Sequence, residues 1–180
     1  PTATAIEEME YAEALIDAAM ASTDSRIAEG KPVTPAFILA ALLWPPTVQL
    51  ARQLEDEGEA PMSAMGEAAQ TIIGEQIHHI AIPRRFTAPM REIWEFQLRL
   101  LKRKGKGTRG LVSHRRFRAA YDFVLLREQS GEDLDGLGKF WTELQESLPP
   151  APDVPLEDSD EEPRPKKRRR RRRRPQKPAQ

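Results

Sequence analysis

The chain has 180 residues, enough for one compact domain with an extension but short of two full domains. It contains no cysteine, which excludes a disulfide framework and a thiolate metal site. No apolar stretch reaches about 18 residues and no export signal opens the sequence, so we expect a cytoplasmic protein without a membrane partner.

Acidic and basic residues are segregated into blocks, although the net charge of the whole chain is zero. Residues 1–80 hold 13 acidic and 3 basic residues, and residues 131–162 hold 11 acidic and 1 basic. Residues 81–130 hold 13 basic and 4 acidic residues, and residues 163–180 hold 11 basic and none acidic. Such segregation indicates an anionic partner for the basic blocks, and nucleic acid is the first candidate.

In the first 80 residues, apolar side chains recur at the helical period. A first helix is predicted by one apolar stripe of Ile6, Met9, Ile16 and Met20. Thr34 and Pro35 are typical of an N-cap and a first helical position, so a second helix is expected over 36–44, ended by Pro45-Pro46. A short third helix is expected over 48–54, and a fourth from Met62 to Ile80.

Three more helices are predicted between residues 87 and 148. Thr87 is expected to cap the fifth, whose stripe is Met90, Ile93, Trp94, Gln97, Leu98 and Leu101. A turn at 105–107 leads to the sixth, with an inward face of Phe117, Ala120, Tyr121, Val124 and Leu125. The seventh runs from about Leu134 to Leu148. No alternation of β type competes with these patterns, so the expected fold is all-α, a body of about seven helices.

The sequence changes character after Leu148. Pro149-Pro150 ends the last helix, and almost no large apolar side chain follows. Such a segment cannot bury enough surface to offset the entropy of ordering, so it should be disordered when alone. The expected organisation is a helical body over 1–148, a proline-rich acidic linker over 149–162 and an arginine-rich tail over 163–180.

Residues that could carry catalysis occur without the spacing that catalysis needs. His78 and His79 would point in different directions from a helix, and His114 stands apart. The glycines at 105–107 and 136–138 lack the spacing of a phosphate-binding loop. The acidic pair in 133–135 is expected to cap a helix, and the pair in 158–160 lies in the linker. We therefore predict no catalytic residue, metal site or bound cofactor in this chain.

Basic residues are spread over two predicted helices and the turn that joins them. A helical hairpin would concentrate this charge at one end, giving a surface suited to phosphate contacts that carry little sequence information. The alternative is a solvated face whose charge is balanced by the acidic first helices. The candidate RNA-binding residues of the body are Arg84, Arg85, Arg91, Arg99, Lys102, Arg103, Lys104, Lys106, Arg109, Arg115, Arg116 and Arg118.

A second basic segment lies near the end of the chain. Arginine forks bind phosphates bidentately and stack on unpaired bases, which favours nucleic-acid binding. Nuclear localisation and membrane-surface binding also fit the composition, and the acidic residues Glu157–Glu162 could fold back onto the segment. Its candidate RNA-binding residues are Lys166, Lys167, Arg168, Arg169, Arg170, Arg171, Arg172, Arg173 and Arg174.

Several strings of residues occur together in one order along the chain. They are Asp24-Ser25-Arg26, Pro35-Ala36-Phe37, Ala81-Ile82-Pro83-Arg84-Arg85-Phe86-Thr87, Phe117-Arg118-Ala119-Ala120-Tyr121-Asp122-Phe123 and Asp160-Glu161-Glu162-Pro163 before the arginine run. Together they resemble the C-terminal region of the bacterial poly(A) polymerase family over essentially the whole chain. One position departs from the family pattern: Arg115 stands where a proline usually follows His114, which removes a helix-start signal and adds a charge.

The resemblance implies a nucleotidyltransferase, related to CCA-adding enzymes, that adds adenylate from ATP to RNA 3′ ends with Mg²⁺ in mRNA processing and decay. In that family an N-terminal head carries the glycine-rich turn and the metal-binding aspartates, and neither motif occurs here. We therefore expect an RNA-binding C-terminal fragment that is inactive alone. Single-stranded RNA 3′ ends, bound with little sequence preference, are the expected partner, and RNA-decay proteins are further candidates.

Two other functions follow from the residues without the resemblance. A free-standing interaction module would use its acidic helices for a protein and its tail for nucleic acid. A self-sufficient enzyme would need the catalytic site that the sequence lacks.

Overall fold

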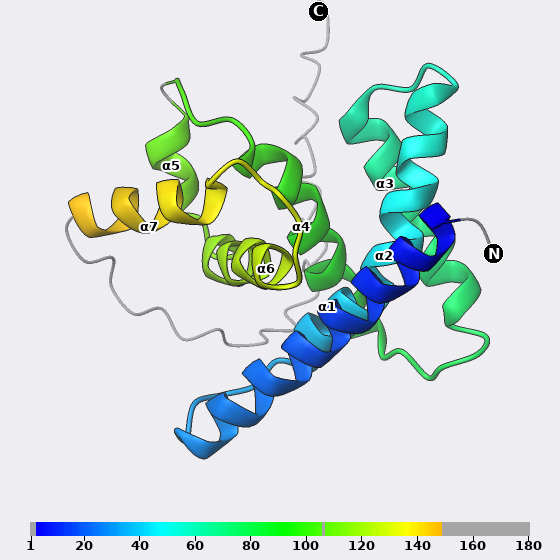
Figure 1. Cartoon of the computed structure of the whole chain (residues 1–180), viewed down its shortest axis with the longest axis horizontal. Helices are drawn as coiled ribbons and strands as arrows, with labels where there is room; N and C mark the ends of the chain where they lie inside the picture. Colours follow the sequence, from blue (N-terminus) through cyan, green and yellow to red (C-terminus); the bar gives the residue numbers. More distant parts are fainter. Residues whose placement is uncertain (1–2, 106, 149–180) are drawn as a thin grey trace, which may run out of the picture.

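The computed structural model describes residues 3–105 and 107–148, which form helices and no strand (Figure 1). The all-α fold and the expected number of about seven helices are confirmed for this part of the chain. Lys106, the predicted linker and the arginine-rich tail lie outside the described residues. The helices are α1 (Ala3–Ala28), α2 (Pro35–Asp56), α3 (Pro61–Gln76), α4 (Arg84–Leu100), α5 (Thr108–Val112), α6 (Phe117–Gln129) and α7 (Leu137–Ser147).

The helices are arranged around α2 and α4. α2 packs against α1, α3 and α4, and α4 also packs against α3 and α6. α7 lies against α6, and α1 runs along α2 and reaches α6 as well (Figure 1). The two longer helices of the basic block, α4 and α6, are therefore direct neighbours. None of the helices described combines the length and apolar character that crossing a bilayer requires.

The buried side chains form two hydrophobic clusters, and α4 and α6 contribute to both. The larger cluster joins α1, α2 and α3 to one side of α4 and contains Trp44 and Trp94. The smaller cluster joins α4, α6 and α7 and contains Trp141. Trp94 donates its indole N–H to the carbonyl of Ala40 at 3.1 Å, and Trp141 donates to the carbonyl of Leu100 at 3.0 Å. The indoles of Trp94 and Trp141 therefore have the hydrogen-bond partner that burial requires.

The inward face of α1 is not the one that its larger apolar residues mark. Leu15 and Ala19 are 0% and 1% exposed, whereas Ile6, Met9 and Met20 are 45%, 62% and 46% exposed. The buried face carries Tyr11, Leu15, Ala18 and Ala19, which pack on the larger hydrophobic cluster. The predicted apolar stripe of the first helix was therefore wrong.

α2 continues through Pro45 and Pro46, where the sequence predicted its end. The two prolines provide no N–H for the carbonyls one turn earlier, a cost of about 3 kcal/mol or more for each in a helix interior. Buried residues on both sides of the prolines, among them Leu43 and Thr47, offset this cost. The predicted second and third helices are consequently one helix.

Several helix ends also differ from the predicted ones. α2 begins at the predicted proline, but the Thr34 side chain makes no capping hydrogen bond. α4 begins at Arg84, and the Thr87 hydroxyl lies within its first turn, donating to the Arg84 carbonyl at 2.8 Å. Leu100, 0% exposed, takes the buried position expected for Leu101, which is 53% exposed. Predicted helix ends that rested on one side chain were therefore the least accurate.

The region after α4 contains one helix that the sequence did not predict. α5 has only 5 residues, too few to show a helical period. α6 buries Phe123 and Leu126, whereas the predicted inward residue Leu125 is 37% exposed. α7 begins at Leu137, three residues after the predicted start. α3 likewise ends at Gln76, before the predicted end.

A buried arginine on α6 makes polar contacts with α2, with α4 and with the turn after α6. The guanidinium of Arg127, a residue 7% exposed, donates to both carboxylate oxygens of Glu132 and, at 3.0 Å, to Oε1 of Gln97. It also lies over the Trp44 ring, 4.8 Å from the ring centroid. Glu132 in turn accepts a hydrogen bond from the Tyr11 hydroxyl at 2.7 Å. This Arg127 network joins α1, α2, α4 and α6 through polar contacts whose formal charges balance.

Replacing Arg127 by methionine is expected to lower the free energy of unfolding by about 3–5 kcal/mol, because Glu132 and Gln97 lose their partner inside the protein. Urea denaturation at neutral pH measures the difference. Lys139→Met removes a charge from an exposed pair with Glu143 and is expected to change the free energy by less than about 0.5 kcal/mol. Equal effects of the two substitutions would contradict the role given to Arg127.

The Arg127 network also predicts a pH dependence of stability. Burial alone would raise the pKa of Glu132, but hydrogen bonds from Arg127 and Tyr11 and the charge of Arg127 hold that pKa below its ordinary value of 4.5. A carboxyl group with a lowered pKa stabilises the fold above its unfolded-state pKa, and this contribution is lost as the pH falls through the folded-state pKa. Urea denaturation at a series of pH values should therefore show stability falling below pH 4.5. Glu132→Gln should reduce that slope, and an unchanged slope would rule out this contribution.

Gly138 allows the start of α7 to lie close to α6. Its N–H donates to Oε1 of Glu128 at 2.9 Å, and an added Cβ would meet the same carboxylate and lie 2.7 Å from Leu125 Cδ2. Gly138→Ala is therefore expected to lower the free energy of unfolding by about 1–3 kcal/mol in urea denaturation. Gly74→Ala, inside α3 with open space around the new Cβ, is expected to raise it by up to about 1 kcal/mol. Effects of the same sign would argue against the close packing of α7.

Candidate nucleic-acid interface

α4 carries a row of arginines on its outer side. Arg84, Arg91 and Arg99 are 7 and 8 residues apart, a spacing that returns to the same side of a helix, and all three are exposed. At the helical rise the row spans about 22 Å. The length of the row is therefore enough to follow several nucleotides of an extended strand.

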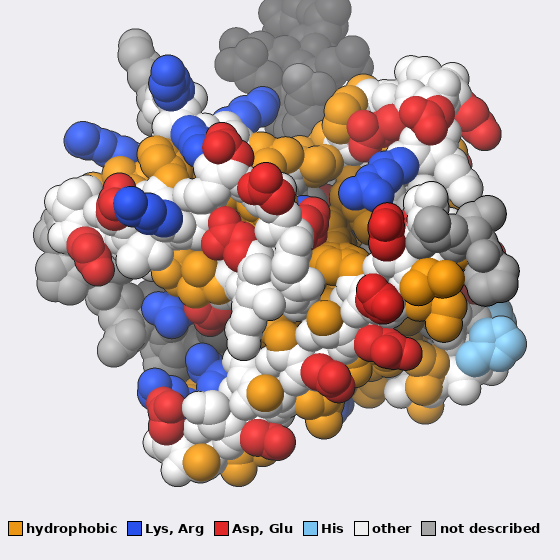
Figure 2. All heavy atoms as spheres, viewed as in Figure 1, with side chains coloured by type: hydrophobic (Ala, Val, Ile, Leu, Met, Phe, Trp, Pro, Cys, Tyr) orange, Lys and Arg blue, Asp and Glu red, His pale blue; other side chains and the backbone are white. Residues whose placement is uncertain are grey.

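The loop after α4 and the short α5 extend this row. Lys102, Lys104 and Arg109 are exposed there, and Arg85 is exposed at the start of α4. Figure 2 shows basic side chains gathered around α5 and the loop before it, and acidic side chains along α1 and around the α2–α3 connection. On this face the acidic side chains of the first helices thus lie apart from the basic side chains around α5, whereas acidic residues after residue 130 lie among the basic ones and pair with Arg103 and Arg127.

Seven of the candidate residues form what we call the free basic surface. Within the part of the chain that the structure describes, none of the seven takes part in an ion pair. The guanidinium of Arg99 lies 5.2 Å from the ring centroid of Phe96, and that of Arg85 lies 4.7 Å from Phe86. Both rings are buried, so they support the arginines but offer no face to a base. The seven residues are Arg84, Arg85, Arg91, Arg99, Lys102, Lys104 and Arg109.

Two other candidates are paired with one carboxylate. Glu92 on α4 accepts hydrogen bonds from Arg115, at 3.1 Å, and from Arg116. Burial would raise the pKa of Glu92, but the hydrogen bonds and charges of the two arginines lower it. Arg115 is the position where the sequence departs from the family pattern, and here it fastens the turn before α6 to α4. The missing proline does not prevent α6 from beginning at Phe117.

Arg103 and Arg118 also have partners within the body. Arg103 donates to the backbone carbonyls of Leu134 and Asp135 at 3.0 and 2.7 Å, which fixes the turn before α7. Arg118 pairs with Asp122 one turn further along α6. Four candidates, Arg103, Arg115, Arg116 and Arg118, are therefore paired with acidic residues of the body. Their partners lie on α4, on α6 and in the turn before α7. None of the four is paired with the acidic first helices, as the alternative interpretation expected. Lys106 and the nine candidates of the tail are outside the described residues.

Histidines and acidic residues of the described chain do not assemble a metal site. No group of three or more His, Asp or Glu side chains that could hold a metal occurs in residues 3–105 and 107–148. His78 and His79 lie exposed in the turn after α3, not on a helix as predicted. The His114 ring packs against Phe96, with 4.7 Å between the ring centroids, and partial burial lowers the pKa of His114.

The acidic pair before α7 does not cap that helix, contrary to the prediction. Asp133 Oδ1 accepts the N–H of Asp135 at 2.9 Å and so shapes the preceding turn. Gly136, with φ of 66°, then separates the pair from the helix. The cap comes instead from Glu128 of α6, which accepts the N–H of Gly138. The second predicted pair, at 158–160, lies outside the described residues.

Acidic residues inside the basic block were the signal that the sequence analysis missed. Residues 81–130 contain only 4 acidic residues. Three of them have fixed partners: Glu92 binds two arginines, Asp122 binds Arg118, and Glu128 caps α7. An acidic residue inside a basic block is therefore a good candidate for a structural ion pair or a helix cap. The basic residues that it pairs with are the ones less available to an external anion.

The part of the chain that carries the free basic surface matches a known protein family. Residues 57–175 match the family model described as the arginine-rich C-terminus of polymerase A. The chain belongs to this family. The match takes in α3 to α7 and the arginine run, so the predicted resemblance is confirmed.

Curated relatives of this polymerase A C-terminal region carry the name poly(A) polymerase I. The chain is 39% identical to that of Escherichia coli O157:H7 over 154 residues, which are 84% of this chain and 33% of the relative. It is 38% identical to that of Salmonella typhimurium over the same length, with the same shares of both chains. It is 36% identical to that of Haemophilus influenzae over 142 residues, 77% of this chain and 31% of the relative. The chain thus spans about a third of the length of these relatives.

Proposed function

We propose that this chain is the RNA-holding region of a poly(A) polymerase, the enzyme that adds adenylate from ATP to RNA 3′ ends. The observation that carries the proposal is the free basic surface of α4 and α5, which lies inside the range matched by the polymerase family. ATP and Mg²⁺ belong to the complete enzyme, and the chain alone is proposed to add no adenylate. The reaction takes place in the cytoplasm, where bacterial RNA and ATP are found.

The chemistry of the surface favours contacts to the RNA backbone. Guanidinium and ammonium groups bind phosphates in any sequence, and affinity then depends on salt because counterions are released. The aromatic rings beside the surface, Phe86 and Phe96, are 7% and 1% exposed and so cannot stack on bases. This argues for binding with little sequence preference.

The arginine run at 168–174 is proposed to add a second, longer-range attraction for RNA. Seven adjacent arginines raise the local concentration of a polyanion without a fixed geometry. The acidic residues at 157–162 would compete with RNA for this run and weaken loose binding. The three segments 1–148, 149–162 and 163–180 are then body, linker and tail in function as well as in composition.

A free-standing interaction module is the second candidate, and the exposed side of α1 favours it. Ile27 is 61% exposed, and with Ile6, Met9 and Met20 it leaves large apolar side chains of α1 in solvent among acidic residues. Such a face suits a protein partner. RNA-decay proteins are the partners that this candidate would bring to RNA.

The proposal predicts that two separate basic segments contribute to RNA binding. Two variants of the full chain are made. The α4 variant replaces Arg84, Arg91 and Arg99 by glutamine, and the tail variant replaces the seven arginines of 168–174 by glutamine. Fluorescent single-stranded RNA is titrated by anisotropy over a series of salt concentrations. Each lost phosphate contact should reduce the log–log salt slope by about 0.7, so the α4 variant should lose up to about 2. Replacing Lys31, Arg52 and Lys139 by glutamine removes three charges elsewhere, as many as the α4 variant, and should change the slope little.

Glu92→Gln is a variant expected to increase RNA binding. It frees Arg115 and Arg116 next to the free basic surface and removes one negative charge. Circular dichroism checks that the helices are retained. The RNA-holding role would have to be abandoned if RNA affinity did not depend on salt concentration in any variant. It would also have to be abandoned if the control substitutions lowered the salt slope as much as the α4 substitutions do.

A further inference from the structure

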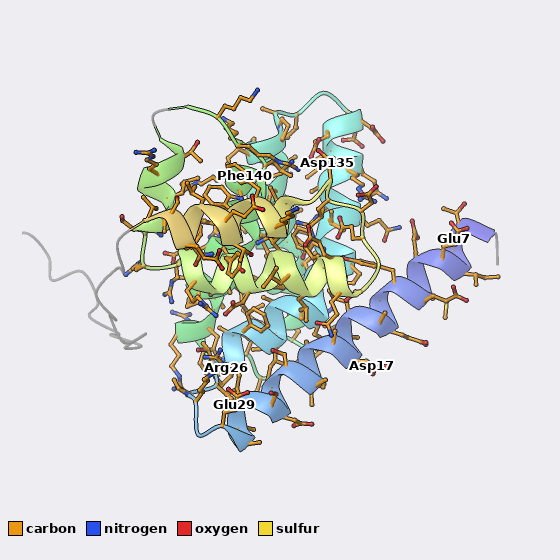
Figure 3. The ribbon with its side chains drawn as sticks, turned by 60° about the vertical axis from the view of Figure 1, so that its left-hand side comes forward. Glu7, Asp17, Arg26, Glu29, Asp135 and Phe140 are labelled. Carbon is orange, nitrogen blue, oxygen red and sulfur yellow. The ribbon has the colours of Figure 1, made fainter. Side chains whose placement is uncertain are left out.

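A cavity of about 300 Å³ lies where the end of α1, the start of α2 and α6 meet. Figure 3 shows Arg26 at this end of α1, close to the start of α2. The residue strings 24–26, 35–37 and 117–122, which carry the family resemblance, each contribute to the cavity wall. Its volume is at the lower end of the range for small-molecule pockets. A duplex or a folded peptide segment is too large for it.

Two arginines present unused donors to the cavity. Arg118 contacts Asp122 through Nε, and Arg26 donates from Nε to the carbonyl of Pro32 at 3.2 Å. Among the residues that the structure describes, the terminal nitrogens of both guanidiniums have no hydrogen-bond partner. Both side chains also line the cavity. Two guanidinium edges with free donors on one cavity are suited to a phosphate group.

The balance of charge at the cavity also favours an anion. Asp122 is the carboxyl group among the lining residues, which include two arginines. Burial raises the pKa of Asp122, although the charges of Arg118 and Arg26 oppose the rise. As the pH falls toward this raised pKa, Asp122 becomes partly protonated. It then neutralises less than one of the two positive charges of Arg26 and Arg118.

The rest of the cavity offers an apolar wall and free polar groups. Phe37 and Leu126 line it, and the Phe37 ring is fixed edge-on against Phe123 with 5.7 Å between centroids. Ser22, Thr34 and Gln129 also line it, and in the described chain their side chains form no hydrogen bond. An apolar wall beside free hydroxyl and amide groups is suited to a flat heterocycle with a polar edge.

We propose that this cavity binds one nucleoside phosphate, with the phosphate on the terminal nitrogens of Arg26 and Arg118 and the base against Phe37 and Leu126. The inference rests on the proposed function in one respect: RNA held on α4 is one source of the nucleotide. Arg115 and Arg116, bound to Glu92 of α4, immediately precede the helix that carries Arg118, so α4 and this helix are directly joined by that turn. A free mononucleotide is the other source.

Calorimetric titration of the full chain with AMP tests the inference. Arg26→Gln with Arg118→Gln should weaken binding by about tenfold or more. Arg84→Gln with Arg91→Gln removes two charges from the free basic surface and should leave AMP affinity within about twofold. Ser22→Leu fills the cavity from an exposed position of α1 without a change of charge and should also weaken binding. Inorganic phosphate and adenosine, each offering half of the contacts, should bind more weakly than AMP.

Titration of single-stranded RNA with the same variants distinguishes the sources. Weaker binding of both AMP and RNA by the cavity variants supports a nucleotide of RNA, and weaker binding of AMP alone supports a free nucleotide. AMP and RNA affinities that are both insensitive to the cavity variants overturn the inference. A loss of RNA binding confined to the α4 variant would then leave the proposed function standing. AMP binding by a chain that binds no RNA would reject the proposed function and retain the cavity site.

Discussion

The body depends on how the buried charge of Arg127 is compensated. A guanidinium without partners inside a protein costs several kcal/mol, so α6 can pack only where Gln97 and Glu132 reach it. This requirement sets the register of α6 on α4, and it extends to α1 through Tyr11 and to α2 through the Trp44 ring. Burial and the nearby Glu132 raise the pKa of Tyr11, so its hydroxyl keeps its proton and remains a donor.

The same register separates the basic residues into two groups. With α6 fixed on α4, Glu92 is brought to Arg115 and Arg116, and the turn before α7 is brought to Arg103. These arginines stabilise the body and lose much of their attraction for a polyanion. Among the described residues the row on the outer side of α4 has no ion-pair partner, which leaves its charge available to the proposed RNA ligand. One helix thus supports the core on its inner side and forms the proposed interface on its outer side.

Helix content and the basic side of α4 were predictable because both depend on local spacing. Gln97 was placed correctly on the buried stripe, but nothing local shows that its partner is Arg127, which is 30 residues away in sequence. The inward face of α1 could not be predicted from apolar periodicity, since two stripes compete and only packing on the larger hydrophobic cluster decides between them. The ion pairs of Glu92 and the cavity at Arg26 and Arg118 likewise depend on which helices become neighbours. Local patterns therefore predicted the secondary structure, and tertiary packing decided which charges stay free.

Pro45 and Pro46 make the folding of α2 depend on that of α4. On either side of the prolines the helix has segments of about ten residues, each too short to be stable alone in water. The backbone ladder is interrupted between them, and the Trp94 indole from α4 bonds the Ala40 carbonyl on the N-terminal side of the interruption. α2 can therefore become one continuous helix only as α4 docks against it. Secondary structure in this part of the chain is a product of tertiary assembly, and amide protons in both halves of α2 should become protected from exchange in the same cooperative step.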